Sequence, residues 1–293
     1  MKPESPYVYP PRGQHTHTFI MLHGRDGTGS EFCEQLFWSV TSQMKNLPEN
    51  LPSFRWVFSS SETCYSAMSQ QQESSWFDIC SLTNTDAQQE LQVRGLRNSV
   101  LKILDILKDE IDLIGDPTRV FLGGISQGMA TALCTFLCAP GRIKGPLGGV
   151  VGFCGWLPFV EQAETLVRRQ HAEDLLRQYS ISSSKIRSQS SMLDKRLQLS
   201  KLFLDTIAGP NIHQVTEETD KSVLSTPVFL SHGSDDRLVS VRHFRRALHV
   251  LRDVGFSTEW KEFVGAEAEG HWIKQPEGIE YVVEFIQRQA SEE

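Results

Sequence analysis

The sequence predicts an α/β fold in which a mostly parallel central sheet is covered by helices on both faces. Short strand-like runs alternate along the chain with longer segments whose apolar residues recur at helical spacing. This alternation is typical of βαβ units, whose connecting helices pack on the two sides of parallel strands. The expected strands are residues 16–22, 54–58, 118–123, 148–154, 226–231 and 257–264.

The expected helices lie between these strands, and the segment 87–114 shows the helical pattern most clearly. Its apolar side chains recur every three or four residues, as the buried face of an amphipathic helix requires. They are Leu96, Val100, Leu101, Ile103, Leu104, Leu107 and Ile111. The expected helices are residues 28–45, 87–114, 127–139, 241–253 and 276–290.

Residues 160–225 interrupt the alternation of strands and helices. Residues 161–179 and 193–207 are expected to be helical, and seven serines lie between positions 180 and 191. We therefore expect residues 1–293 to form a single domain with a helical insertion at 160–225. Two interpretations of the insertion stay open: a structural decoration on the sheet edge, or a lid on a flexible serine-rich hinge.

Composition excludes several classes of protein. A net charge of −7 offers no basic face for nucleic acid or an anionic membrane. No apolar run approaches 18 residues, and the first 20 residues contain no signal-peptide core. The six cysteines have no disulfide or zinc spacing, so we expect reduced thiols, no metal and a cytoplasmic setting. Cys134 and Cys138 share one face of an apolar helix and are interpreted as buried thiols.

A candidate nucleophile lies at the junction between an expected strand and an expected helix. Ser126 occupies the centre of Gly124-Ile125-Ser126-Gln127-Gly128, directly after the apolar strand 118–123. A sharp strand-to-helix turn exposes a serine hydroxyl, and flanking glycines let the two elements approach closely. The motif alone is weak, because this composition produces it by chance quite often. Its context therefore decides.

Candidate partners for Ser126 follow two later strands, in the chain order nucleophile, acid, histidine that is typical of α/β-hydrolases. Asp235 and Asp236 follow the strand 226–231, and His271 follows the strand 257–264. Parallel sheets keep their sites at these strand ends. We prefer Asp236 as the acid, but spacing alone leaves Asp235 open.

Three other histidines are weaker candidates for the base. His232 also follows a strand, but a histidine before glycine at a strand end more often forms a local hydrogen bond. His243 and His249 lie in an expected amphipathic helix, where a packed or solvated imidazole is the default.

A glycine-rich loop after the first strand is a candidate oxyanion hole. Residues 23–29 contain three glycines, which allow backbone amides to turn toward the serine. The expected donors are the amides of Arg25 and Gln127, one from this loop and one from the residue after the nucleophile. The alternative is an ordinary glycine-rich turn.

Five short blocks of the chain carry a resemblance to a known family. They are Leu22-His23-Gly24, Ser75-Trp76-Phe77-Asp78-Ile79, Gly123-Gly124-Ile125-Ser126-Gln127-Gly128, Cys154-Gly155-Trp156-Leu157-Pro158 and His232-Gly233-x-x-Asp236. Together they resemble the acyl-protein thioesterase / phospholipase-carboxylesterase family, over about residues 16–160 and 225–290. The resemblance implies an α/β-hydrolase fold, the triad Ser126, Asp236 and His271, and oxyanion donors Arg25 and Gln127. It also implies an acyl pocket near Trp76, Trp156 and Leu157, although a packing role for each tryptophan is an equal alternative.

Three features depart from the family pattern. Arg25 puts a cation beside the expected site, residues 58–62 lack a typical proline, and about 70 residues separate Trp156 from His232. We expect a cofactor-independent serine hydrolase of esters or thioesters, with acylated proteins or lysophospholipids as the substrates that the resemblance implies. The alternatives are a short-chain carboxylesterase and a ligand-binding module built on a hydrolase fold.

Overall fold

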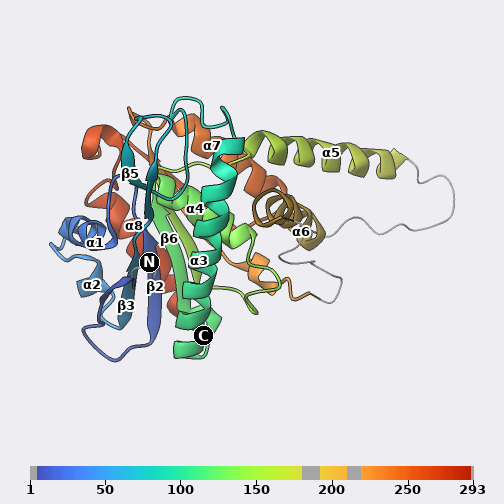
Figure 1. Ribbon diagram of the computed structural model, residues 1–293. Helices are drawn as coiled ribbons and strands as arrows, with labels where there is room; N and C mark the ends of the chain where they lie inside the picture. Colours follow the sequence, from blue (N-terminus) through green and yellow to red (C-terminus); the bar gives the residue numbers. More distant parts are fainter. Residues whose placement is uncertain (1–4, 180–191, 210–218, 292–293) are drawn as a thin grey trace.

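The computed structural model of the protein describes residues 5–179, 192–209 and 219–291 (Figure 1). Within them, seven strands form a sheet in the order β1–β3–β2–β6–β7–β8–β9. Only β1 runs antiparallel to its neighbour, so the expected mostly parallel sheet is confirmed. The strands are β1 (Tyr7–Tyr9), β2 (His17–Leu22), β3 (Phe54–Ser59), β6 (Val120–Ile125), β7 (Gly149–Phe153), β8 (Val228–Gly233) and β9 (Thr258–Phe263).

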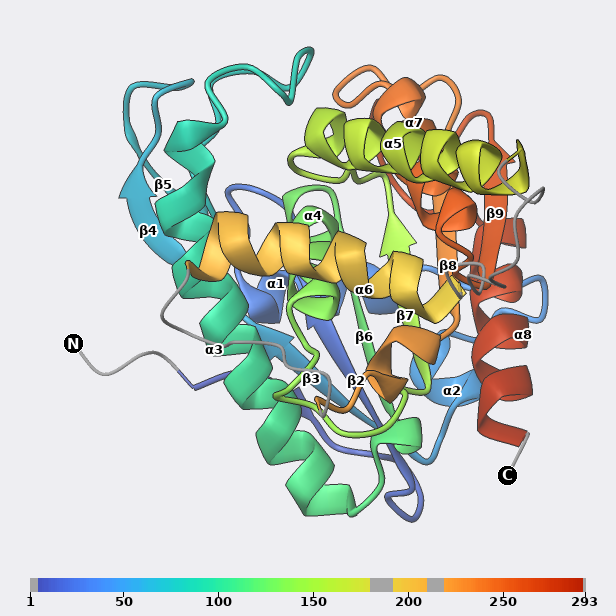
Figure 2. The same cartoon turned by 90° about the vertical axis from the view of Figure 1, so that its right-hand side faces the viewer.

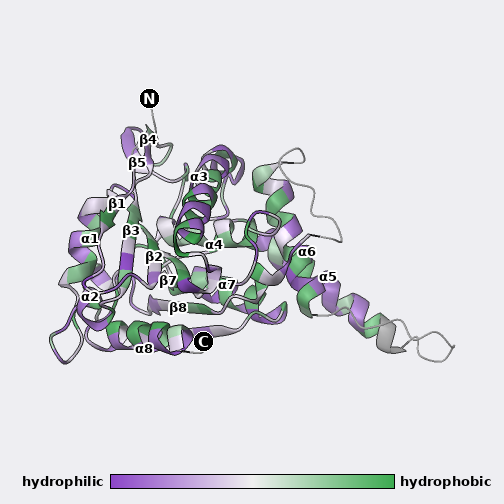
Figure 3. Ribbon diagram, turned by 90° about the horizontal axis from the view of Figure 1, so that it is seen from below, coloured by the Kyte–Doolittle hydropathy of each residue, from purple (hydrophilic) through white to green (hydrophobic). Residues whose placement is uncertain are grey.

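Helices cover both faces of the sheet (Figures 2 and 3). One face carries α1 (Gly29–Trp38), α2 (Leu47–Asn50) and α8 (Glu277–Ser291), and the other carries α3 (Glu90–Ile114), α4 (Gln127–Leu137) and α7 (Val241–Asp253). Successive side chains of a strand point to opposite faces. In β2, Phe19 and Met21 accordingly join the core on the α1 and α8 side, while Ile20 and Leu22 join the core on the α3 and α4 side.

Helix α4 is buried on every side, and all eleven of its residues are inaccessible to solvent. Glycines at its start allow this close packing. A Cβ on Gly128 would lie 2.3 Å from the Leu22 carbonyl oxygen, and one on Gly124 would lie 2.8 Å from the same atom. No larger side chain fits at these two positions, so helix and strand can meet here only through glycine.

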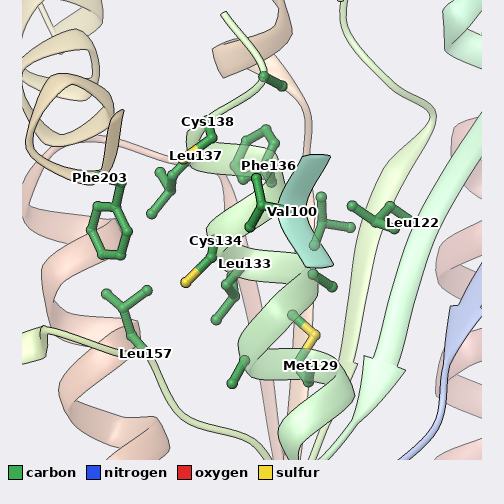
Figure 4. Packing of buried hydrophobic residues seen from close by; sticks show 14 of the residues in the cluster. Val100, Leu122, Met129, Leu133, Cys134, Phe136, Leu137, Cys138, Leu157 and Phe203 are labelled. Atoms are coloured by element: carbon green, nitrogen blue, oxygen red, sulfur yellow. The ribbon is translucent and has the colours of Figure 1, made fainter. Parts of the chain in front are cut away.

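The insertion packs on the outer side of α4. It contains α5 (Val160–Tyr179), α6 (Met192–Phe203) and a π-helical turn (Leu204–Ala208), so both expected helices are confirmed. Phe203 of α6 and Leu157 lie beside Leu133 and Cys134 of α4 (Figure 4). The Ser200 hydroxyl also donates to the Leu137 carbonyl at 2.7 Å.

Helix α5 extends away from the body of the molecule (Figure 1). The α7 residue Arg246 holds it through Glu164, at 2.8 Å. Packing of α6 on the core is what the decoration interpretation expects. The serine-rich hinge expected at 180–191 lies outside the described residues, and the lid interpretation stays a prediction.

The structure differs from the sequence prediction in several short elements. The expected helix 28–45 ends at Trp38, because the following loop turns toward the C-terminal part of the chain. There the amides of Val40 and Ser42 donate to Gln275 and Glu280, at 3.1 and 2.9 Å. Periodicity also did not reveal β1, α2 or the antiparallel hairpin of β4 (Glu62–Tyr65) and β5 (Gln72–Ser75).

Short turns complete the described structure. They are the 3-10 turns Pro117–Arg119, Ser222–Ser225 and Ala268–Gly270. None of the helices in the described part of the chain is long and apolar enough to cross a membrane.

Candidate active site

The candidate site residues gather at one edge of the sheet. Strands β6, β7, β8 and β9 are parallel neighbours, so their carboxyl ends lie side by side. Ser126 directly follows β6, Asp236 follows β8, and His271 follows β9. Open α/β sheets bind their ligands at this edge.

Ser126 sits in a strained turn between β6 and α4. Its φ of 57° and ψ of −126° lie outside the regions that a residue with a Cβ normally adopts. The turn is held by the Ser126 amide, which donates to the Phe153 carbonyl at 2.9 Å. The loop after β2 passes close by, because a Cβ on Gly24 would lie 3.5 Å from the Ser126 Cβ. Such backbone strain is concentrated at functional sites.

Asp236, and not its neighbour, is bonded to the candidate base. Asp236 Oδ2 lies 2.6 Å from His271 Nδ1, whereas Asp235 Oδ2 accepts the Gly265 amide at 2.8 Å. The other oxygen of Asp236 accepts the amides of Leu238 and Val239, each at 2.9 Å. The choice that sequence spacing left open therefore falls on Asp236 in this geometry.

The environment of Asp236 keeps its carboxylate ionised. Its side chain has no exposed surface, and burial alone raises the pKa of a carboxyl group. Four interactions outweigh this effect of burial. They are the hydrogen bonds from His232 and His271, the positive charge that His271 can carry, and the hydrogen bond from the Val239 amide. They hold the pKa of Asp236 well below its usual range. An ionised partner is what a base needs to stabilise its imidazolium form.

The three histidines that were weaker candidates for the base make other contacts or are exposed. His232 Nε2 lies 2.8 Å from the Val239 carbonyl, which confirms the expected local hydrogen bond. Its second contact, with Asp236 Oδ2 at 3.0 Å, was not foreseen from the sequence. On α7, His243 contacts Thr85 at 3.4 Å and His249 is exposed.

The candidate oxyanion loop is fixed by the β4–β5 hairpin and by His23. The Asp26 amide donates to the Ser74 carbonyl at 2.9 Å, which docks the loop on β5. His23 Nε2 accepts the Ser61 amide at 2.9 Å, so its proton is on Nδ1, 2.5 Å from the Gly24 carbonyl oxygen. Burial lowers the pKa of His23 to about 4, which keeps this ring neutral.

Gln127 joins the nucleophile turn to the Ser75-Trp76-Phe77 segment. It opens α4, and the amide of a helix's first residue has no acceptor within the helix. Its side-chain oxygen accepts the Trp76 amide at 2.9 Å and the Ser75 hydroxyl at 3.0 Å, while its Nε2 donates to the Phe77 carbonyl at 2.7 Å. The Trp76 indole donates in turn to the His23 carbonyl at 2.8 Å. This segment therefore braces both expected oxyanion donors.

One group of side chains near the site has the donor types of a metal centre. Ligand atoms of Cys154, His232 and Asp236 lie within 4.8 Å of one another. The carboxylate already receives both histidines and two backbone amides, so an ion would have to displace them. Burial raises the pKa of the Cys154 thiol and opposes the thiolate that a metal prefers. The group fits a hydrogen-bonded acid better than a metal site.

Comparison with known proteins decides the family. Residues 3–174 match the phospholipase/carboxylesterase family. The chain belongs to this family of hydrolases. It is 24% identical to acyl-protein thioesterase 1 of Gibberella zeae, over 97% of the chain and 95% of that protein. It is 25% identical to carboxylesterase SOBER1 of Arabidopsis thaliana, over 92% and 90%.

A solved structure of the same family shows the same fold. The crystal structure of Zea mays acyl-protein thioesterase 2 superimposes with a TM-score of 0.62 at 22% identity. The superposition covers 97% of the chain and 98% of that structure. The expected α/β-hydrolase fold is thus confirmed.

Three residues that the family resemblance placed near an acyl pocket are buried. Trp76, Trp156 and Leu157 each have 2% or less of their surface exposed. Trp76 has the bracing role described above. The Trp156 indole nitrogen has no hydrogen-bond partner among the described residues, so it does not brace a loop in the same way. Contact with a substrate would require a pocket that opens to these side chains, and their binding role stays a prediction.

Arg25 is not the free cation that its position in the sequence suggested. Its guanidinium binds the carboxylate of Glu73 on the hairpin, and only 11% and 4% of the two side chains are exposed. Pairing with a buried carboxylate offsets most of the positive charge that an arginine would otherwise place beside the site. The arginine that departs from the family pattern at position 25 is thus paired with Glu73, 48 residues further along the chain.

Proposed function

We propose that the protein is a serine hydrolase of acyl thioesters and esters, with acyl-protein thioesterase activity as its main function. The observation that carries the proposal is the 2.6 Å hydrogen bond between His271 and a buried, ionised Asp236, at the sheet edge that also presents Ser126. The full-length similarity to an acyl-protein thioesterase 1 supports the choice of substrate class.

The proposed reaction follows from the chemistry of these side chains. His271 Nε2 removes the proton of Ser126 as its hydroxyl attacks the acyl carbonyl, and Asp236 stabilises the resulting imidazolium. The amides of Arg25 and Gln127 donate to the oxyanion. His271 returns the proton to the leaving thiolate or alkoxide. Water, activated by the same histidine, then attacks the acyl-enzyme and releases the acid.

Labelling with a fluorophosphonate probe tests the nucleophile. The wild-type chain should label in a 1:1 ratio, and Ser126→Ala should not label. Ser231→Ala is a matched control, because Ser231 is also a buried serine but lies within β8, before the acid loop. A wild-type chain that folds, binds acyl ligands and fails to label would favour the ligand-binding module instead.

A small-molecule carboxylesterase is the second candidate, and the similarity to carboxylesterase SOBER1 favours it. Matched pairs of thioesters and oxygen esters, from acetyl to palmitoyl, separate the two candidates. An acyl-protein thioesterase should gain in kcat/KM with chain length, because each buried methylene contributes about 0.8 kcal/mol. A preference for acetyl esters of simple alcohols would instead establish the short-chain esterase.

We also propose a reducing, cytoplasmic setting for the protein. All six cysteines are free thiols, and four of them are buried. Fractionation of cells that express the tagged chain tests this proposal. Recovery of the chain from an oxidising compartment would contradict it.

A further inference from the structure

His232 is a buried histidine at the end of β8 that the proposed reaction does not use. No part of its side chain is exposed. Its Nε2 faces two oxygen atoms, the Val239 carbonyl at 2.8 Å and Asp236 Oδ2 at 3.0 Å. Both atoms are acceptors, so Nε2 must carry the ring proton. Nδ1 has no hydrogen-bond partner among the described residues, so the contacts of this ring all run through Nε2.

Two imidazoles therefore share one carboxylate oxygen. Asp236 Oδ2 receives His271 Nδ1 at 2.6 Å and His232 Nε2 at 3.0 Å. The opposite oxygen receives the amides of Leu238 and Val239. Each oxygen thus has two donors, and the carboxylate can neither rotate nor shift without losing one of them.

We propose that His232 is a positioning residue of the catalytic triad, which holds Asp236 Oδ2 in line with His271 through its Nε2–H donor. The inference rests on the proposed function, because it acts through the Asp236–His271 pair. A donor on Oδ2 also withdraws negative charge from the oxygen that faces His271, and that charge favours the imidazolium form of a neighbouring ring.

Two of the titratable neighbours of this pair are Cys154 and His243. Cys154, after β7, has ligand atoms within 4.8 Å of both His232 and Asp236. His243 on α7 is close enough to His232 to interact with it electrostatically. Burial raises the pKa of the Cys154 thiol, and burial lowers the pKa of His243, so both are neutral near pH 7. Neither neighbour therefore brings a charge to Asp236 that would stand in for the His232 donor.

A packing role is the competing explanation, because the His232 ring also contacts Phe244, with ring centroids 5.7 Å apart. Two substitutions separate the roles. His232→Phe keeps an aromatic ring and removes the donor. His232→Gln loses the ring but places an amide N–H near the position of Nε2. His243→Phe is the matched control, since its ring contacts Thr85 rather than Asp236.

The experiment measures kcat, KM and the pH profile of kcat/KM on one thioester for the wild type and these three variants. We expect His232→Phe to lose about 10- to 100-fold in kcat with little change in KM, as misplacement of a catalytic group does. The acid limb of its profile should move to higher pH. His232→Gln should stay within a few-fold of the wild type, and the control should be unchanged.

Several outcomes would overturn the inference. They are a His232→Phe variant with the wild-type kcat and pH profile, or a His232→Gln variant as impaired as His232→Phe. If the Phe variant does not fold, ¹⁵N shifts of labelled histidine in the wild type decide instead. A ring protonated on Nε2 supports the inference, and one protonated on Nδ1 overturns it. A wild-type chain without hydrolase activity would overturn the proposed function, and this inference with it.

Discussion

The guanidinium of Arg25 binds the buried carboxylate of Glu73, and this pair fastens the loop after β2 to the β4–β5 hairpin. Ser69 Oγ supports the same carboxylate at 2.8 Å. Burial raises the pKa of Glu73, but hydrogen bonds from Ser69 and Ser66 and the charge of Arg25 outweigh it and lower the pKa. The Arg25 amide is a proposed oxyanion donor. By binding the Arg25 side chain, the hairpin should therefore help to hold that backbone amide in place.

Breaking the pair should reduce turnover equally for neutral and anionic substrates. We expect Arg25→Leu to lose about 3 kcal/mol of unfolding free energy, because it leaves Glu73 buried without its partner. Its kcat should fall about tenfold, less than the loss of an oxyanion donor outright. The double variant Arg25→Leu/Glu73→Leu should recover part of both losses, as a double-mutant cycle would show.

Arg288→Leu is the control for a pair far from the site, since Arg288 and Glu259 are about half exposed and contribute little. A selective loss of activity on anionic esters in Arg25→Leu would show that the guanidinium contacts substrate after all.

Adjacent aspartates should differ strongly in their effect on catalysis. Asp236→Asn should lower kcat by about 10⁴-fold, because an amide favours the wrong tautomer of His271. Asp235→Asn should change kcat little, since Asp235 is exposed and bonds only the Gly265 amide among the described contacts. Steady-state kinetics on one ester decide the matter, and equal losses would contradict the assignment of the acid.

Two substitutions of Ser126 should abolish activity but differ in stability. Ser126→Ala and Ser126→Gly both remove the hydroxyl and should lower kcat by about 10⁶-fold. Ser126→Gly should be the more stable by about 1 kcal/mol, because a φ of 57° with ψ of −126° strains alanine more than glycine. Urea unfolding of the two variants measures the difference. Greater stability of the alanine variant would mean that the turn relaxes when the hydroxyl is removed.

Acid should destabilise the fold through His23. The unfolded chain binds a proton on this histidine near pH 6.5, whereas the folded chain binds it only near pH 4. Stability contributed by the neutral ring is therefore complete above about pH 6.5. It is lost as the pH falls toward 4, by up to roughly 3 kcal/mol.

His23→Asn keeps a donor near the position of Nδ1 but cannot titrate, so its unfolding free energy should vary less between pH 7 and pH 4 than that of the wild type. His249→Asn, at an exposed position on α7, should retain the wild-type pH dependence. Identical curves for the wild type and His23→Asn would show that His23 does not titrate in this way.

Local pattern predicted which strand each candidate residue follows, because each candidate lies in the segment after a strand-like run. Ser126, Asp236 and His271 could be placed from the strand-like runs that precede them and from the common edge at which parallel strands end. Partners from distant segments could not be predicted. Glu73 lies 48 residues from Arg25, and nothing near either residue indicates the other.

His232 is a case between these two. Its four-residue spacing from Asp236 was visible in the sequence, but only the curvature of the acid loop brings Nε2 to the carboxylate. The end of α1 at Trp38 likewise depends on Gln275 and Glu280, which the periodicity of residues 28–45 cannot reveal. The spacing of apolar residues indicates which face of a helix packs on the sheet. It does not indicate which distant polar group ends the helix.

The burial of α4 on all sides has a consequence for local motions. Amides exchange with deuterated water through local opening, which is rarest where a helix has no solvent face. Part of that protection comes from the insertion, since Phe203 and Ser200 of α6 cover the outer side of α4. Ser126 thus directly precedes a fully buried helix, whereas Asp235 and Leu238 of the acid loop are exposed. We therefore expect the α4 amides to exchange more slowly than those of the acid loop, and loss of α6 to narrow that difference.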